Sequence, residues 1–83
     1  MVPTVRLYSL STCGSCRAVK QLLAKTGIPH EIIDVDLLDD ARRRLVMPEF
    51  KKANPRGSFP TTVIRDRVIV GNDSKAILEA LYL

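Results

Sequence analysis

The stretch Tyr8-Ser9-Leu10-Ser11-Thr12-Cys13-Gly14-Ser15-Cys16 decides the fold of this 83-residue chain. It holds both cysteines of the chain, Cys13 and Cys16, three residues apart. It begins inside the segment Val5–Ser9, which alternates apolar and polar residues and is rich in strand formers. The sequence therefore predicts a strand over 5–9 that leads, through a short loop, to a cysteine pair.

A helix is predicted directly after this strand, from about Cys13 to Thr26, with both cysteines in its first turn. Ser11 and Thr12 are favourable N-cap residues. Gly27 is a natural left-handed stop, and Pro29 prevents the helix from continuing.

The spacing of Cys13 and Cys16 predicts redox chemistry. Residues three apart on a helix are neighbours on one face, so two thiols there can close a disulfide with little backbone movement. The helix N-terminus stabilises a thiolate and lowers its pKa, which makes the first cysteine a nucleophile. We expect Cys13 to attack a substrate disulfide and Cys16 to resolve the mixed disulfide, with Arg17 and Thr12 beside them as activating groups.

Two other interpretations of the cysteine pair are inert buried thiols and half of a zinc site. Zinc requires four ligands, and the only other soft ligand is His30, which is predicted to lie beyond the far end of the helix. No metal is therefore expected.

The rest of the chain predicts a mixed sheet. His30–Asp36 is a second strand, parallel to the first if the helix is a crossover. A helical pattern then runs to residue 53, and Pro48 should kink or split that helix. Its apolar face comprises Leu38, Ala41, Leu45, Val46, Phe50 and Ala53.

The last third of the chain predicts a hairpin and a final helix. Residues 61–64 and 68–70 are apolar strands around a turn, and Gly71-Asn72-Asp73 leads to a helix whose inward residues are Ala76, Ile77, Ala80 and Leu81. The order βαβαββα predicts one α/β domain over 1–83, a four-stranded mixed sheet flanked by three helices.

Composition excludes several classes of protein. The chain is 46% hydrophobic, which is ordinary for a globular domain, and no stretch approaches the about 18 apolar residues of a membrane span. Its start lacks the apolar core of a secretory signal, so we expect a cytoplasmic protein. The net charge of +4 favours anionic partners. Arg42-Arg43-Arg44 would fan over about 200° of a helix, so no nucleic-acid partner is expected.

Three segments together resemble the glutaredoxin family of the thioredoxin fold: Tyr8 to Cys16, Ser58-Phe59-Pro60, and Val70-Gly71-Asn72-Asp73. The resemblance covers almost the whole chain. It implies a glutaredoxin-like thiol-disulfide oxidoreductase that reduces protein disulfides or glutathione mixed disulfides through Cys-Gly-Ser-Cys.

The resemblance also implies roles for residues outside the cysteine motif. Pro60 matches the cis-proline of the family, and the backbone of Phe59 would pair with extended substrate or glutathione. Both residues, with Thr12, would shape the substrate groove. Gly71, Asn72 and Asp73 match the segment that holds the γ-glutamyl end of glutathione, although Asn72 or Asp73 can also cap the last helix.

The sequence departs from the family pattern at positions that touch glutathione. Leu10 stands where many members have a lysine, Gly14 and Ser15 replace the usual proline and aromatic residue, and Ser74 replaces a second aspartate. Arg56 is a candidate substitute for the missing lysine as partner of the glycyl carboxylate. The electron donor is therefore either glutathione or a thioredoxin-reductase-type flavoprotein.

An alternative function follows from the same resemblance. Some glutaredoxin-like proteins hold a [2Fe–2S] cluster between two subunits with the first motif cysteine and bound glutathione, and Gly14 is compatible with that role. The retained Cys16 favours the disulfide reductase.

Overall fold

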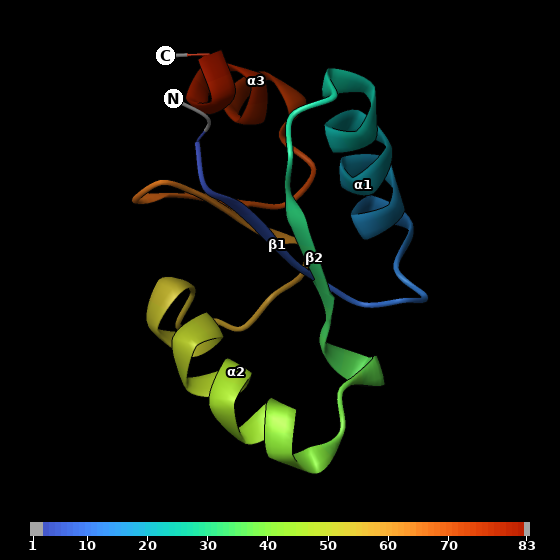
Figure 1. Cartoon of the computed structure of the whole chain (residues 1–83), viewed down its shortest axis with the longest axis vertical. Coiled ribbons are helices and arrows are strands. Elements are labelled where there is room, and N and C mark those ends of the chain that lie inside the picture. The colour runs from blue at the N-terminus through green and yellow to red at the C-terminus, as the bar shows by residue number, and fades with distance from the viewer. Residues whose placement is uncertain (1–2, 83) are drawn as a thin grey trace.

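A computed structural model describes residues 3–82 of the chain. The predicted order of strands and helices is confirmed, with one short 3-10 helix (η1) added before the second α-helix (Figure 1). The elements are β1 (Val5–Ser9), α1 (Gly14–Thr26), β2 (Glu31–Asp34), η1 (Val35–Leu37), α2 (Asp40–Ala53), β3 (Thr61–Ile64), β4 (Arg67–Val70) and α3 (Ser74–Tyr82).

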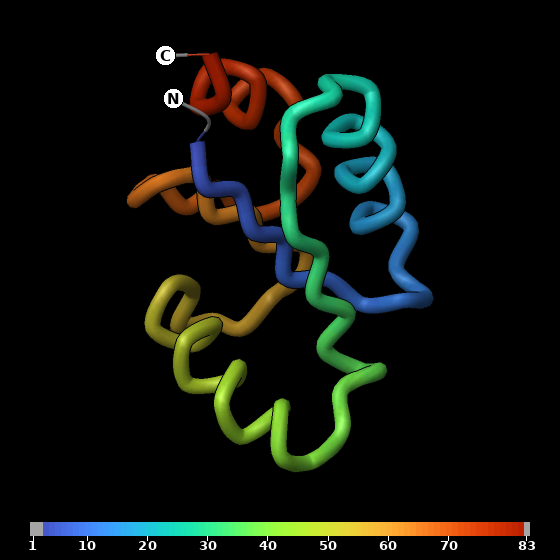
Figure 2. Tube along the Cα trace, viewed as in Figure 1, coloured from blue at the N-terminus to red at the C-terminus, as the bar shows by residue number. Residues whose placement is uncertain are grey.

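The four strands form one mixed sheet in the order β2-β1-β3-β4. β1 runs parallel to β2 and antiparallel to β3, and the path from β1 through α1 to β2 is the expected crossover (Figure 2). Ser9 pairs with Asp34, and Thr61 pairs with both Tyr8 and Val70. The ends of β1, β2 and β4 therefore meet the start of β3 at one edge of the sheet.

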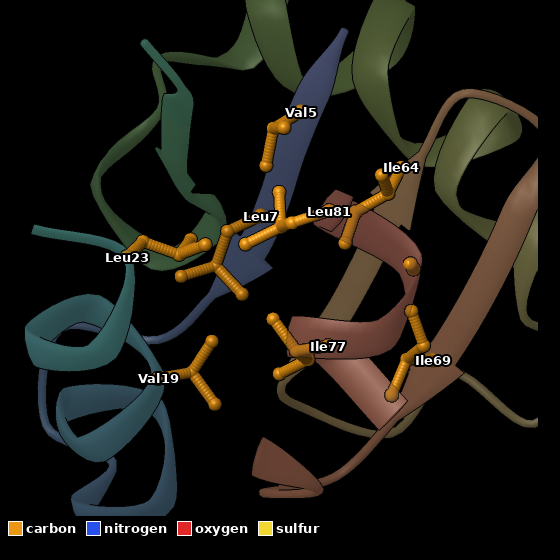
Figure 3. Packing of buried hydrophobic residues seen from close by; sticks show 9 residues of the cluster. Val5, Leu7, Val19, Leu23, Ile64, Ile69, Ile77 and Leu81 are labelled. Carbon is orange, nitrogen blue, oxygen red and sulfur yellow. The ribbon is translucent and has the colours of Figure 1, made fainter. Parts of the chain in front are cut away.

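The main hydrophobic core lies between the sheet and the pair α1 and α3 (Figure 3). Because side chains alternate along a strand, Val5 and Leu7 of β1 face this core while Tyr8 faces the opposite side. The buried members of the core come from five elements: Val5, Leu7, Val19, Leu23, Ile64, Ile69, Ile77, Ala80 and Leu81. Of the four inward residues predicted for the last helix, Ile77, Ala80 and Leu81 are buried, and Ala76 is partly buried against the same core.

The opposite face of the sheet contacts α2 through aromatic side chains. The rings of Tyr8 and Phe50 are 5.2 Å apart, and Phe50 stacks on Phe59 at 4.8 Å. Phe50 is the one fully buried side chain of α2, whereas Leu45 is 77% exposed. The apolar face predicted from spacing is therefore buried only in part, because the contact of this helix with the sheet centres on Phe50.

Of the two outcomes predicted for Pro48, a split does not occur, since α2 runs unbroken from Asp40 to Ala53, and a kink stays a prediction. Proline removes a single intrahelical hydrogen bond, and both ends of α2 are satisfied. Asp39 accepts the N–H of Arg42, and Asn54 donates its N–H to the carbonyl of Phe50. These hydrogen bonds and the buried Phe50 ring stabilise the helix on both sides of Pro48.

The other predicted boundaries shift by no more than two residues. The second strand ends at Asp34, since residues 35–37 turn into η1, and the fourth strand begins at Arg67. None of the helices in residues 3–82 has the length and apolar character that a membrane span requires.

Candidate active site

Cys13 is the N-cap of α1, a position that the sequence assigned to Ser11 or Thr12. Its backbone is extended, its N–H donates to the Leu10 carbonyl at 3.3 Å, and its own carbonyl accepts the N–H of Arg17 at 3.0 Å. Its sulfur accepts the N–H of Cys16 at 3.2 Å. The cysteine sulfur thus takes the place of the usual side-chain oxygen of an N-cap.

The surroundings of Cys13 lower the pKa of its thiol. The thiol of Cys16 is the largest cause, and the backbone N–H groups of Cys16 and Ser15 add to it. Burial opposes them with an effect larger than that of Ser15, and the charge of Lys20 is the smallest of the causes that lower the pKa. Each of these groups favours the thiolate, so Cys13 is chemically the more reactive thiol.

Cys16 lies in the opposite environment, fully buried under the first turn of α1. Burial raises the pKa of its thiol to about 11, and the hydrogen bond with Cys13 contributes to the rise. Both cysteines are free thiols in this structure. The pair therefore combines a partly exposed nucleophile with a protonated thiol held directly behind it.

Pro60 lies at the sheet edge where the cysteine loop begins. The Phe59–Pro60 peptide bond is cis, as the resemblance implies. Thr61 pairs with Tyr8 of β1, which places the buried Pro60 beside the strand end that leads into the cysteines. The Pro60 carbonyl accepts the N–H of Gly71 at 2.8 Å, so the segment after β4 joins the same edge.

Asp73 caps the last helix. Its Oδ1 accepts the N–H of Ala76 at 3.1 Å, and its carbonyl accepts the N–H of Ile77 at 3.0 Å. Asn72 and Asp73 are both exposed. The capping role expected for this segment is thus present, and exposure leaves the same carboxylate accessible to a ligand.

Three further predicted site residues are exposed: Thr12, Arg17 and Arg56. Thr12 directly precedes Cys13, and Arg17 follows Cys16 on α1. The backbone N–H of Arg56 donates to the Asn54 side chain at 3.2 Å. The activating role of the first two and the carboxylate-binding role of Arg56 stay predictions.

Asn54 is a buried residue that the sequence does not single out as part of the site. Its side-chain amide donates to the carbonyl and hydroxyl of Ser58 and to the Thr61 hydroxyl, at 3.0 to 3.3 Å. These bonds fix the loop that carries Arg56, Phe59 and Pro60. An asparagine before Pro55 is an ordinary loop signal, and nothing in the sequence distinguishes a buried brace from an exposed turn residue.

Lys20 and Asp34 form a second feature that sequence reasoning missed. The Lys20 Nζ lies 2.8 Å from the Asp34 Oδ1, and the Ser9 hydroxyl donates to the same oxygen at 2.5 Å. Nearby, Asp36 accepts hydrogen bonds from both the N–H and the hydroxyl of Ser11. The spacing of Lys20 four residues after Cys16 was the available signal, because it places both on one helix face.

No group of three or more His, Cys, Asp or Glu side chains within residues 3–82 is arranged to hold a metal ion. His30, the remaining candidate ligand, hydrogen-bonds through its Nδ1 to the Ile28 carbonyl at 2.8 Å.

With this geometry in view, comparisons with known proteins identify the family. A protein-family model described as Glutaredoxin matches residues 5–69, a segment that contains both cysteines and Pro60. The chain belongs to the glutaredoxin family. Its thioredoxin fold, with a four-stranded mixed sheet and three helices, agrees with this assignment, and membership supports a thiol oxidoreductase activity in general.

Two solved structures of family members are similar over nearly the whole chain. Methanoredoxin from Methanosarcina acetivorans is 38% identical with a TM-score of 0.90, and the match covers 96% of this chain and 85% of that one. A glutaredoxin from Methanosarcina mazei is also 38% identical, with a TM-score of 0.88 over 96% of this chain and 79% of that one.

A curated relative of different length also matches. Glutathione S-transferase Z1 of Arabidopsis thaliana is 38% identical over 79 residues, which is 95% of this chain but 33% of that protein. The chain thus spans about a third of the length of this relative.

Proposed function

We propose that this glutaredoxin reduces protein disulfides or glutathione mixed disulfides through Cys13 and Cys16. The Cys13 thiolate attacks one sulfur of the substrate disulfide, and the other sulfur leaves as a thiolate that takes up a proton. Cys16 then loses its proton and attacks the Cys13 sulfur of the mixed disulfide. The second substrate thiol is released, and the enzyme is left with a Cys13–Cys16 disulfide.

The difference between the two cysteine environments carries this proposal. The sulfur of Cys13 is held against the N–H of Cys16 at 3.2 Å, in a position that favours a thiolate, whereas Cys16 is fully buried and protonated. A substrate reaches Cys13 first. The buried thiol is protected from outside disulfides, yet it lies beside the sulfur that it must attack.

Glutathione is the electron donor that the site supports best. Two glutathione molecules would reduce the enzyme disulfide in turn and leave as glutathione disulfide. The Gly71–Asp73 segment joins Pro60 at the active-site edge, where an exposed carboxylate suits the ammonium of a γ-glutamyl group. The family is one that uses glutathione, and the curated relative is named for it. A thioredoxin-reductase-type flavoprotein is the rival donor, and the cytoplasmic location stays a prediction.

Intact-mass analysis after alkylation tests the proposal. The oxidised protein is mixed with excess reduced glutathione and quenched at intervals. We expect both thiols to become free within seconds, through a species that is one glutathione heavier. The Cys16→Ser variant cannot form the enzyme disulfide, so it is given glutathione disulfide instead; it should accumulate the species one glutathione heavier, because it lacks the thiol that would displace glutathione from Cys13. A disulfide that persists would exclude glutathione as donor and favour the flavoprotein.

The iron–sulfur alternative is tested on the same protein. Gly14 leaves open space in the first turn of α1, since a Cβ built there would meet nothing within 4 Å. Protein purified without oxygen should be colourless if the reductase proposal holds. A visible absorbance that disappears in air would favour cluster binding instead.

A further inference from the structure

We propose that Lys20, held in place by Asp34, is a positioning residue that keeps Cys13 in its reactive form and favours the reduced dithiol. This inference rests on the proposed function, because it concerns how the same cysteine pair is tuned. It assigns the tuning charge to the middle of α1, whereas the sequence pointed to Arg17 in the first turn.

Helix geometry directs Lys20 towards the dithiol. Lys20 lies four residues after Cys16, which is about 6 Å along the axis and about 40° around it. Side chains on a helix tilt towards its N-terminus, so the long lysine stem extends back over the face that carries Cys16. The charge of Lys20 lowers the pKa of each thiol, and for Cys13 it adds to the larger effects of the hydrogen bonds from Cys16 and Ser15.

The ammonium of Lys20 is fixed by a partner on the sheet. Its Nζ contacts the Asp34 Oδ1 at 2.8 Å, and both side chains are only 24% exposed. The buried Ser9 donates its hydroxyl to the same carboxylate oxygen and is paired with Asp34 in the sheet. Lys20 and Ser9 both lower the pKa of Asp34, so its carboxylate stays charged at neutral pH. A salt bridge anchored in this way holds its lysine far better than an exposed pair.

The charges around Lys20 explain why the cation is needed. Asp34 at the end of β2 and Asp36 in η1 both lie within its electrostatic reach, as do Cys13 and Cys16 on its own helix. Asp36 accepts hydrogen bonds from the N–H and the hydroxyl of Ser11, so this second carboxylate is fixed beside the cysteine loop. Within residues 3–82, Lys20 is the one cationic side chain among the causes that act on the two thiols, so its removal takes away the cation that favours a thiolate there.

Two consequences for the reaction follow. A thiolate exists only in the reduced enzyme, so a cation that stabilises it shifts the dithiol–disulfide equilibrium towards the dithiol. Cys13 is also a better leaving group: when a second glutathione attacks the glutathione sulfur of a Cys13 mixed disulfide, the bond to Cys13 breaks, glutathione disulfide forms, and Cys13 leaves faster as a thiolate of lower pKa.

Labelling of the reduced protein with iodoacetamide tests the role of Lys20. The rate at Cys13 is measured by peptide mass across a pH series for wild type, Lys20→Gln and Lys20→Arg, with Lys25→Gln as the control at the exposed far end of α1. In Lys20→Gln we expect the midpoint of the labelling rate against pH to move to higher pH. At pH values below the wild-type midpoint, the labelling rate should fall about threefold, which is the effect of one unit charge several ångströms away. Lys20→Arg and Lys25→Gln should follow the wild-type profile.

A double variant separates charge from structure. Lys20→Gln leaves Asp34 unpaired, whereas Lys20→Gln with Asp34→Asn removes the pair together. If the effect is electrostatic, the pH profile of Cys13 labelling in the double variant should lie closer to the wild-type profile than the Lys20→Gln profile does. A Lys20→Gln profile that overlays wild type, or a Lys20→Arg profile that shifts as far, would overturn the proposal. Iodoacetamide needs no disulfide substrate, so this result stands apart from whether the protein proves to be a reductase.

Discussion

The starts of α1 and α2 are built alike but hold different side chains. Each has an extended N-cap residue whose side chain accepts the N–H three residues on: Asp39 from Arg42 at 2.8 Å, and Cys13 from Cys16 at 3.2 Å. The cap of α2 is a carboxyl group, whereas the cap of α1 is a sulfur that is charged only as a thiolate. The comparison teaches that the proposed nucleophile, Cys13, is a helix cap that is charged only when its sulfur is a thiolate.

The two helices also differ in what they rest on. α1 buries Cys16, Val19 and Leu23 against the core between the sheet and α3, whereas α2 is anchored mainly by Phe50. The reactive cap therefore sits on the firmly packed helix. The cap of α2, by contrast, begins a helix that is packed less firmly, because its Leu45 side chain is exposed.

The largest effect is expected when the sulfur of the α1 cap is replaced. Cys13→Ser should abolish disulfide reduction, because the nucleophile is lost while a capping oxygen remains. Cys13→Asp should also be inactive, yet at least as stable as wild type in urea, since aspartate is among the best N-caps. An active Cys13→Ser variant would contradict the assignment, and a Cys13→Asp variant that is much less stable would break the comparison with Asp39.

The packing difference is tested by one leucine from each helix. Leu23→Ala should lower the free energy of unfolding by about 2–5 kcal/mol, because it opens a cavity in the core. Leu45→Ala should change it by no more than about 0.5 kcal/mol, because the side chain is exposed. Urea unfolding of both variants gives the comparison, and equal losses would show that α2 is packed as firmly as α1.

The cap of α2 should affect stability alone. Asp39→Ala removes the acceptor of the Arg42 N–H and should cost about 1 kcal/mol. The rate of disulfide reduction by the folded variant should equal that of wild type. A loss of activity in folded Asp39→Ala would mean that α2 shares in the reaction.

A smaller effect concerns the pH dependence of stability. The pKa of Cys13 is lowered by folding, so the unfolded chain binds more protons between the folded pKa and the ordinary value of about 8.5. Wild type should therefore gain stability relative to Cys13→Ser as pH rises through that window, and lose the gain as pH falls. Cys16, whose pKa rises to about 11, acts in the opposite direction at higher pH. If the urea midpoints of wild type and Cys13→Ser differ by the same amount at every pH from 6 to about 8.5, that result would contradict a capping thiolate.

Local patterns were sufficient for much of the fold and for the cysteine pair. The alternation in Val5–Ser9 and the spacing of Cys13 and Cys16 are properties of neighbouring residues, and both appear in the structure as expected. The cis bond before Pro60 was not a local inference. It came from the family resemblance, since residue type alone favours a trans bond.

The missed features all depend on segments that are distant in the chain. Lys20 meets Asp34 only because β2 returns beside β1, and Asn54 becomes a buried brace only because Thr61 starts a central strand. The exposure of Leu45 has the same origin, because helical spacing shows which residues share a face but not whether the sheet extends beneath it.

The most direct test of the account is which cysteine reacts first. Reduced protein is given less than one equivalent of iodoacetamide at neutral pH, and the label is mapped by peptide mass. The account predicts that nearly all of the label is on Cys13, because its thiolate is stabilised at the helix cap while Cys16 is buried and protonated. Equal labelling of the two, or a preference for Cys16, would contradict it.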